Sequence, residues 1–252
     1  MSRPHPLATH AALLALVVLA NGCAQAALVE LEVVDRSSNT ALDTYVHRGT
    51  RFVAGTPGQR YALRLNNRSG GRVLVVLSVD GVNVVSGETA AWGQTGYVLP
   101  PWGSAEIAGW RKNMSETAAF YFAALPESYA ARTGRPDNVG VIGAAVFRER
   151  YIPPPAPLAA APAARSAEAA AGTSADRAMA KKSEQLGTGH GEREYAPTEY
   201  TEFVRASSRP DEVVQIRYDS YPNLLASGVI ARPRPMPLEP QAFPGFVPDP
   251  RY

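Results

Sequence analysis

Hydrophobic and polar positions alternate along much of the chain between residues 27 and 150. In the stretch LVELEVVD, the apolar positions 29, 31 and 33 alternate with Glu30 and Glu32. This period of two is typical of a strand with one buried face. RVLVVLSV is instead apolar on both faces, as in the middle of a packed sheet. The pattern predicts six strands, at residues 28–35, 60–67, 72–79, 104–112, 117–125 and 139–150.

Turn residues separate these strands, and no long helical period lies between them. Many short strands at regular spacing indicate an all-β fold, here an antiparallel β-sandwich, of which the jelly roll is one form. Residues 27–150 have the usual length of a single domain. One or two short helices are expected, the first at PESYAARTG, from near Pro126 to a stop at Gly134.

The composition changes after this region. Residues 151–185 are rich in alanine and proline and predict a disordered linker. Residues 186–230 regain strand patterns, at TEFVRA and EVVQIRYDS, and then a helical turn that ends at Gly228. Because so short a segment cannot easily build its own core, we expect it to pack on the sandwich. The proline-rich residues 231–252 predict a disordered tail.

Three polar residues, Ser78, Asp80 and Asn83, interrupt the valine-rich stretch RVLVVLSVDGVNVVSG. Asp80-Gly81 between two apolar arms is a strong signal for a two-residue type I′ hairpin, in which both central residues take positive φ. In that register Ser78 faces Asn83 across the hairpin. We therefore interpret Asp80 and Gly81 as a structural turn and not as a reactive site.

The first 26 residues have the parts of a secretory signal peptide. Arg3 precedes the apolar run AALLALVVLA, and Ala24-Gln25-Ala26 forms an A-x-A cleavage site. The apolar run is too short to span a membrane, which takes about 20 residues. We expect export, to the periplasm or the extracellular space. Cys23 offers an alternative, because its lipidation would associate the protein with the outer membrane, whereas cleavage at the A-x-A site removes it.

Charge and residue choice argue against several functions. The chain has a formal charge of +2 with interspersed signs, which argues against a nucleic-acid partner. After the signal peptide only His47 and His190 remain as histidines, and no G-x-S-x-G motif is present. This set predicts no catalytic residues, no metal site and no cofactor. The sequence therefore leans towards a protein that is not an enzyme.

A carboxylate-based hydrolase acting on envelope polysaccharide is the alternative. Glu88, Glu106, Glu116 and Glu127 all lie in the predicted β region. A glycosidase of this type needs two carboxyl groups in one cleft. Because the sequence does not reveal strand pairing, it leaves open which of the four lie together.

Aromatic residues gather around the stretch AWGQTGYVLPPWGS. Trp92, Tyr97 and Trp102 lie among glycines and prolines, and rings on such loops stack on sugars or anchor a partner. Trp110 falls on a strand and is expected in the core. His190 in GTGHG is a further candidate for ligand binding. The favoured interpretation of that motif is a turn made by its three glycines.

Several stretches together resemble a family of uncharacterised exported bacterial proteins. They are SVDGVNVVSG, GYVLPPWGSAEIAGWRK, FYFAALPESYAARTGRPDNVGVIGAAVFRER, and GTGHGEREY with TEFVRAS and VVQIRYDSY. The resemblance covers roughly residues 50–150 and 186–230. It implies export and these domain limits, but it implies no activity and no catalytic residues.

The leading hypothesis is thus a non-catalytic exported envelope module that binds a partner protein or a glycan. Its candidate ligand-binding residues are Trp92, Tyr97, Trp102 and His190. The hydrolase is one alternative. A lipid-anchored assembly factor, attached to the membrane through Cys23, is the other.

Overall fold

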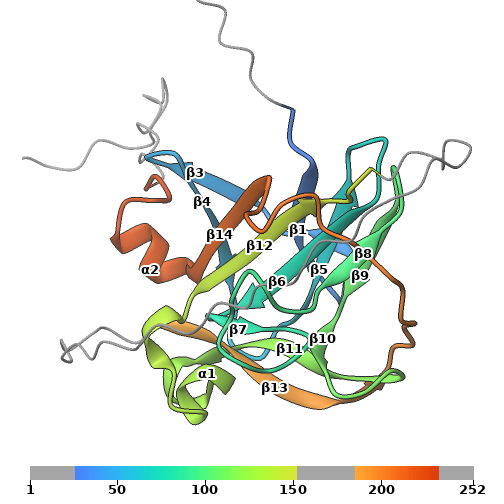
Figure 1. Ribbon diagram of the computed structural model, residues 1–252. Coiled ribbons are helices and arrows are strands. Elements are labelled where there is room, and N and C mark those ends of the chain that lie inside the picture. Colours follow the sequence, from blue (N-terminus) through green and yellow to red (C-terminus); the bar gives the residue numbers. More distant parts are fainter. Residues whose placement is uncertain (1–25, 152–184, 233–252) are drawn as a thin grey trace, which may run out of the picture.

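The computed structural model describes residues 26–151 and 185–232. Two sheets of seven strands pack together, and only short helices accompany them (Figure 1). All strand pairs except one are antiparallel. The predicted all-β sandwich with short helices is therefore confirmed.

Sheet A contains the strand that opens the described chain and the first strand after residue 185. Its strands are β1 (Val29–Asp35), β2 (Thr40–Ala41), β5 (Arg60–Asn67), β9 (Ser104–Ile107), β10 (Gly109–Arg111), β11 (Glu116–Ala124) and β13 (Leu186–Tyr195). The order is β10-β11-β5-β1-β2, with β13 paired to β11 and β9 paired to β5.

Sheet B contains the valine-rich hairpin. Its strands are β3 (Thr44–His47), β4 (Thr50–Gly55), β6 (Val73–Val79), β7 (Val82–Asn83), β8 (Tyr97–Leu99), β12 (Val141–Arg148) and β14 (Glu212–Ser220). The order is β3-β4-β14-β12-β6-β7, with β8 paired to β6. β14 runs antiparallel to β12 and parallel to β4. The chain after residue 185 thus contributes one strand to each sheet.

The core lies between the sheets and is built by the alternation seen in the sequence. The apolar positions of β1 are buried, while its glutamates face outward. Tyr61, Phe120 and Phe122 are among the largest fully buried side chains, and the rings of Tyr61 and Phe122 stack with centroids 4.4 Å apart. Trp110 is buried, as predicted. Burial of this apolar surface is the main stabilising force of such a sandwich.

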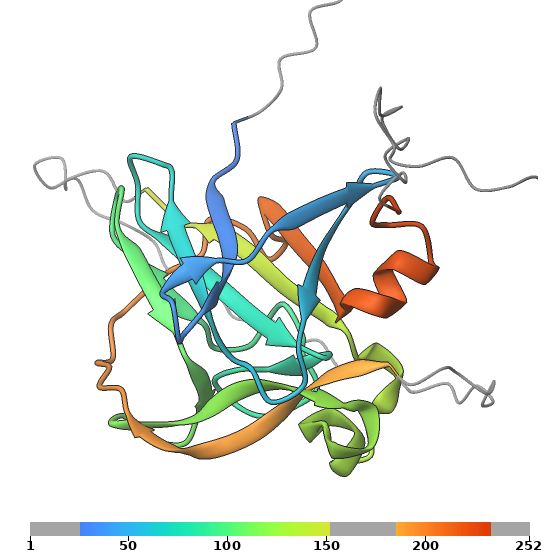
Figure 2. The same cartoon turned by 180° about the vertical axis from the view of Figure 1, so that it is seen from behind.

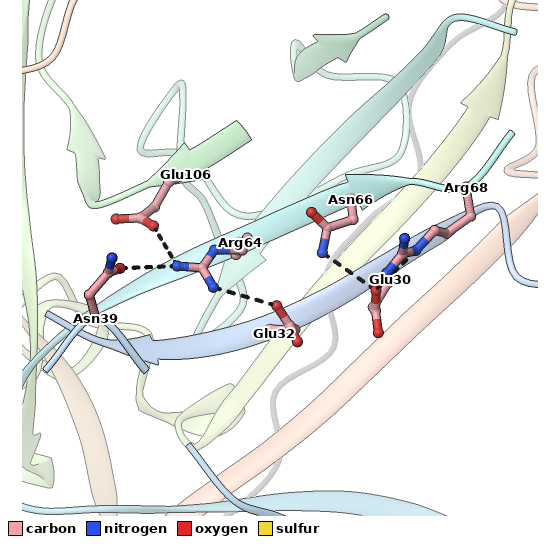
Figure 3. A network of polar contacts seen from close by, with 7 residues as sticks. All are labelled: Glu30, Glu32, Asn39, Arg64, Asn66, Arg68 and Glu106. Carbon is pink, nitrogen blue, oxygen red and sulfur yellow. Dashed lines mark hydrogen bonds and ion pairs between the residues drawn. The ribbon is translucent and has the colours of Figure 1, made fainter. Parts of the chain in front are cut away.

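The outer face of sheet A carries charged residues in opposed pairs (Figure 3). Arg64 on β5 contacts Glu32 on β1 at 3.9 Å and Glu106 on β9 at 3.2 Å. Arg68, just beyond β5, pairs with Glu30 on β1. Opposite charges on neighbouring strands stabilise a sheet modestly, and they keep the exposed face soluble.

Four short helical segments complete the fold: η1 (Leu125–Glu127), α1 (Tyr129–Arg132), η2 (Pro136–Asn138) and α2 (Tyr221–Ala226). The expected helix near residues 126–134 is α1 with η1, and α2 is the second expected helix. Gly134 and Gly228 follow the two α-helices with φ of 76° and 73°. This left-handed conformation, which glycine adopts without strain, ends each helix where the sequence predicts.

Three local predictions are wrong. Residues 104–112 do not form one strand, because the chain leaves β5 after Ile107 and pairs with β11 from Gly109 onward. TEFVRA forms only an isolated bridge from Arg205 to Glu149. GTGHG is no turn but part of β13, and its glycines leave room for neighbours: a Cβ on Gly189 would lie 2.1 Å from the ring of Tyr121.

Several predictions fall wholly or mainly outside the described residues. They are the signal peptide with Cys23, the Ala/Pro-rich linker and the proline-rich tail. Within residues 26–151 and 185–232, no helix is long and apolar enough to cross a membrane.

Candidate functional site

The Asp80-Gly81 turn has the geometry expected of a type I′ hairpin. Its two residues have φ of 52° and 72°. Ser78 pairs with Asn83, and Val79 pairs with Val82. A side chain at Gly81 would also meet η2, because an added Cβ would lie 2.7 Å from the Cβ of Asn138. The hairpin prediction is confirmed in both turn type and register.

Asp80 is more than a turn residue, because its carboxylate is buried and holds several strands together. It accepts hydrogen bonds from the backbone N–H of Gly140 at 2.9 Å and of Thr188 at 2.8 Å. The hydroxyl of Tyr218 donates to it at 2.5 Å. Burial raises the pKa of Asp80 to about 6, and these three donors act against that rise.

The hydrogen bonds continue from Asp80 across the core. Thr188 Oγ1 lies 2.6 Å from the hydroxyl of Tyr218 and 2.6 Å from that of Tyr61. Because the ionised carboxylate can only accept, the chain of donation is directed from Tyr61 through Thr188 and Tyr218 to Asp80. Tyr61 and Thr188 belong to sheet A and Tyr218 to sheet B, so this network joins the two sheets.

The two other polar residues of the hairpin have different roles. Asn83 is buried and organises the following loop: its amide donates to Gln94 and Thr95, and its carbonyl oxygen accepts from the N–H groups of Val85 and Ser86. Ser78 is half-buried, and its hydroxyl lies 3.4 Å from the carbonyl oxygen of Gly143. The stretch therefore serves the fold, and the candidate site lies elsewhere.

Residues 196–205, here called the strap, connect β13 to the region before β14 and run along the side of the sandwich (orange in Figures 1 and 2). Near β13, the N–H of Thr198 donates to the carbonyl of Met114 at 2.8 Å. At the other end, Arg205 donates to the carbonyls of Trp92 and Gln94, both at 2.6 Å, and lies 4.3 Å from the ring centroid of Phe147. The strap is thus fixed at both ends without belonging to a sheet.

Two adjoining pockets, here called the strap pockets, lie where the strap meets the loop before β8. Their volumes are about 320 and 460 Å³. They share the residues of two short segments, Thr95–Tyr97 and Thr198–Tyr200. The smaller pocket also has Arg205 in its wall, and the larger one has Arg111 and Lys112.

The strap pockets combine flat rings with hydrogen-bonding groups. Tyr97 is half-buried and its ring faces the guanidinium of Arg111, 5.9 Å from the centroid. Tyr200 is 88% exposed. Thr95, Thr198 and Asn113 add hydroxyl and amide groups to the walls. Such a concave site with rings and a few polar groups is the usual form of a small-ligand site.

The predicted ligand-binding residues are not brought together. Tyr97 lines both strap pockets, whereas Trp92 lines a smaller neighbouring pocket of about 180 Å³ with Ser78 and Val213. Trp92 and Trp102 are 54% and 71% exposed. Trp102 adopts positive φ in the turn before β9 and lines none of these pockets.

His190 lies on β13 and lines neither strap pocket, but it contacts Lys112 in the wall of the larger one. Its ring stacks on Tyr129, with centroids 5.4 Å apart, and its Nε2 lies 3.2 Å from Nζ of Lys112. Burial lowers the pKa of His190, and the charge of Lys112 lowers it further. The imidazole is thus favoured as a neutral acceptor for the lysine.

Three of the four glutamates considered for a hydrolase have separate partners. Glu106 pairs with Arg64 and Glu116 with Arg193, while Glu88 accepts from Gln94 at 3.2 Å. Glu127 is exposed in η1. None of the four lines a strap pocket. Across the described parts of the chain, no group of three or more His, Cys, Asp or Glu side chains forms a metal-binding cluster.

Sequence reasoning found Tyr97 but missed Arg111, Lys112 and Tyr200. Tyr97 was marked by its place in an aromatic, glycine-rich loop. Tyr200 is distant in the sequence and reaches the pocket only because the strap crosses there. Comparison with protein-family models, curated proteins and solved structures found no match.

Proposed function

We propose that the protein is a non-catalytic, exported module of the bacterial envelope that binds a glycan in the strap pockets. The observation that carries the proposal is the pair of adjoining pockets around Tyr97 and Tyr200. Aromatic rings stack on the apolar faces of sugar rings, and the surrounding hydroxyl and amide groups suit sugar hydroxyls.

The exposed hydrophobic residues and the shape of the site together suit a glycan. Among the described residues, the exposed large hydrophobic side chains are Tyr, Trp and Val, with no Leu, Ile or Phe. Tyr and Trp offer a flat ring together with a hydrogen-bonding group. Because Tyr and Trp also serve protein interfaces, the concave shape of the strap pockets, which suits a small ligand, is what favours a glycan.

Export is supported by the sequence. The basic start, the apolar run and the A-x-A motif at residues 24–26 have the order of a signal peptide. An exported protein meets the polysaccharides of the envelope, so the location and the proposed ligand agree. Lipidation at Cys23 would change the anchoring and leave the strap pockets as they are.

Binding to oligosaccharides tests the proposal. The purified protein is titrated by calorimetry with a panel of neutral and acidic hexasaccharides. We expect at least one to bind with a Kd between about 1 µM and 1 mM, corresponding to about 4–8 kcal/mol. Tyr200→Ala should weaken that binding about fivefold or more, because a stacked ring contributes about 1 kcal/mol or more.

Tyr195→Ala is the matched control. Tyr195 is 80% exposed, lies close to the strap in sequence, and lines neither strap pocket. Its loss should leave binding unchanged. If no hexasaccharide binds, or if both tyrosine variants weaken binding equally, the proposed function is wrong.

A further inference from the structure

The strap pockets have an excess of positive charge. Their walls contain three cationic residues, Arg111, Lys112 and Arg205, and one carboxylate, Glu199. Two other pockets among the described residues do not share this excess. The pocket beside α2 is lined by Asp137, Arg217 and Asp219, and the pocket beside the start of β1 contains two arginines and two glutamates.

The three cations also lack acidic partners within the described parts of the chain. Seven other arginines form ion pairs with Asp or Glu, namely Arg36, Arg60, Arg64, Arg68, Arg72, Arg148 and Arg193. Arg111, Lys112 and Arg205 form none. Arg205 uses backbone carbonyls instead, and Lys112 contacts the ring nitrogen of His190.

Arg111 is the least satisfied of these groups. Its Nη1 donates to the carbonyl of Ala196 in the strap. Its Nη2 lies 3.5 Å from the hydroxyl of Tyr97, at the limit of a hydrogen bond. Its Nε is buried without a partner. A buried donor without an acceptor is unfavourable, and the protein alone leaves this guanidinium incompletely bonded.

The guanidinium nitrogen that a ligand can reach is Nη2, because Nε is buried from solvent and Nη1 already donates to Ala196. An N–H of a charged guanidinium is a strong donor to a carboxylate oxygen. Lys112, the next residue, adds a second positive charge to the same pocket wall. A carboxylate entering beside Tyr97 would therefore accept from Nη2 of Arg111 and be attracted by both positive charges, while its sugar ring meets the tyrosine.

We propose that the glycan is acidic and that Arg111, assisted by Lys112, binds the carboxylate of a uronic acid residue in the larger strap pocket. This inference rests on the proposed function and specifies its ligand. The ring of Tyr97 and the carboxylate site of Arg111 then recognise two features of the same sugar. The charge excess also attracts an anionic polymer before contact is made.

A matched pair of ligands tests the inference. Hexagalacturonate carries carboxylates, and its methyl ester has the same sugar rings without the charges. We expect the acid to bind at least about tenfold more tightly than the ester at low salt, since a charged hydrogen-bonded contact contributes about 1.5–3 kcal/mol. Raising the salt from about 0.05 to about 0.5 M should weaken binding of the acid and not of the ester.

Substitutions test which residues bind the carboxylate. Arg111→Gln and Lys112→Gln should each reduce the ratio of acid affinity to ester affinity. Arg209→Gln removes one positive charge at an exposed arginine outside the strap pockets, and it should leave the preference intact. Circular dichroism and the thermal midpoint check that each variant is folded.

The outcomes separate the two proposals. Equal binding of acid and ester, weakened by Tyr200→Ala, would overturn the acidic ligand and leave glycan binding in place. A preference for the acid that survives Arg111→Gln and Lys112→Gln would also overturn the assignment of the carboxylate site. Binding of neither ligand nor of any other hexasaccharide would contradict the proposed function itself.

Discussion

Asp80 and Arg111 are both charged side chains that the fold withdraws from solvent without an ion-pair partner, and they differ in how completely they are bonded. Asp80 accepts from two backbone N–H groups and from the hydroxyl of Tyr218. Arg111 has one firm bond, one at 3.5 Å, and an unpartnered Nε. A saturated buried charge holds the fold together, whereas an incompletely bonded one has capacity for a ligand.

The largest effect is expected where the saturated charge is removed. Asp80→Ala leaves three buried donors without an acceptor, those of Gly140, Thr188 and Tyr218. It also places alanine at a φ of 52°. Each orphaned donor costs about 1–3 kcal/mol, so we expect a loss of about 3 kcal/mol or more in the free energy of unfolding. Urea unfolding monitored by tryptophan fluorescence measures it.

Arg111→Gln is the corresponding change at the incompletely bonded charge. It removes the bond to Ala196 but also the buried, unpartnered Nε, and because these two losses offset each other we expect the stability to change by less than about 1 kcal/mol. A loss as large as that of Asp80→Ala would mean that Arg111 serves the fold, and the distinction between the two charges would fail.

The pH dependence of stability gives the next effect. Burial raises the pKa of Asp80 from 3.8 to about 6. Between these values the folded protein retains a proton that the unfolded chain has released, so stability falls as the pH rises from about 4 to about 6. The fall is about 3 kcal/mol, at about 1.4 kcal/mol for each unit of pKa difference. Above pH 6 both states are ionised and this contribution stays constant.

Asp80→Asn isolates this contribution. Asparagine has the same shape and tolerates positive φ, but it does not titrate. Urea unfolding of the wild-type protein and the variant at pH 4 and pH 7 gives the change in the free energy of unfolding with pH for each. The contributions of the other carboxylates are the same in both proteins and cancel in the comparison. Equal changes with pH in the two proteins would show that Asp80 does not carry the raised pKa.

How far the sequence predicts these features depends on how local they are. The alternation in β1 and the Asp80-Gly81 turn arise from neighbouring residues, and both are predicted correctly. The partners of Asp80 are not local: Thr188 and Tyr218 lie more than a hundred residues away. No pattern near Asp80 marks them, so its role as the centre of a network is visible only in the structure.

The strap pockets also depend on contacts between residues that are distant in the sequence. The aromatic stretch around Tyr97 marks it as a candidate, but the pattern around Arg111 indicates only the end of an ordinary strand. Its lack of an acidic partner depends on which side chains the sheets and the strap bring close. The prediction of a turn at GTGHG is wrong for a related reason. Glycine predicts a turn when read alone, while at Gly189 it makes room for the ring of Tyr121 in the neighbouring strand.

The smallest effect is expected on the outer face of sheet A, where arginine and glutamate are paired. Arg64→Met breaks contacts with Glu32 and Glu106, but exposed ion pairs contribute only about 0–1 kcal/mol and weaken in salt. We expect a loss within that range at low ionic strength, and a smaller one at about 0.5 M salt. Arg209→Met, an exposed arginine outside these ion pairs, is the control and should show no such salt dependence. A loss of stability at Arg64 that does not change with salt would show that the side-chain stem stabilises the fold by packing. The difference between the paired surface arginines and the unpaired Arg111 would then not be a difference in charge interactions.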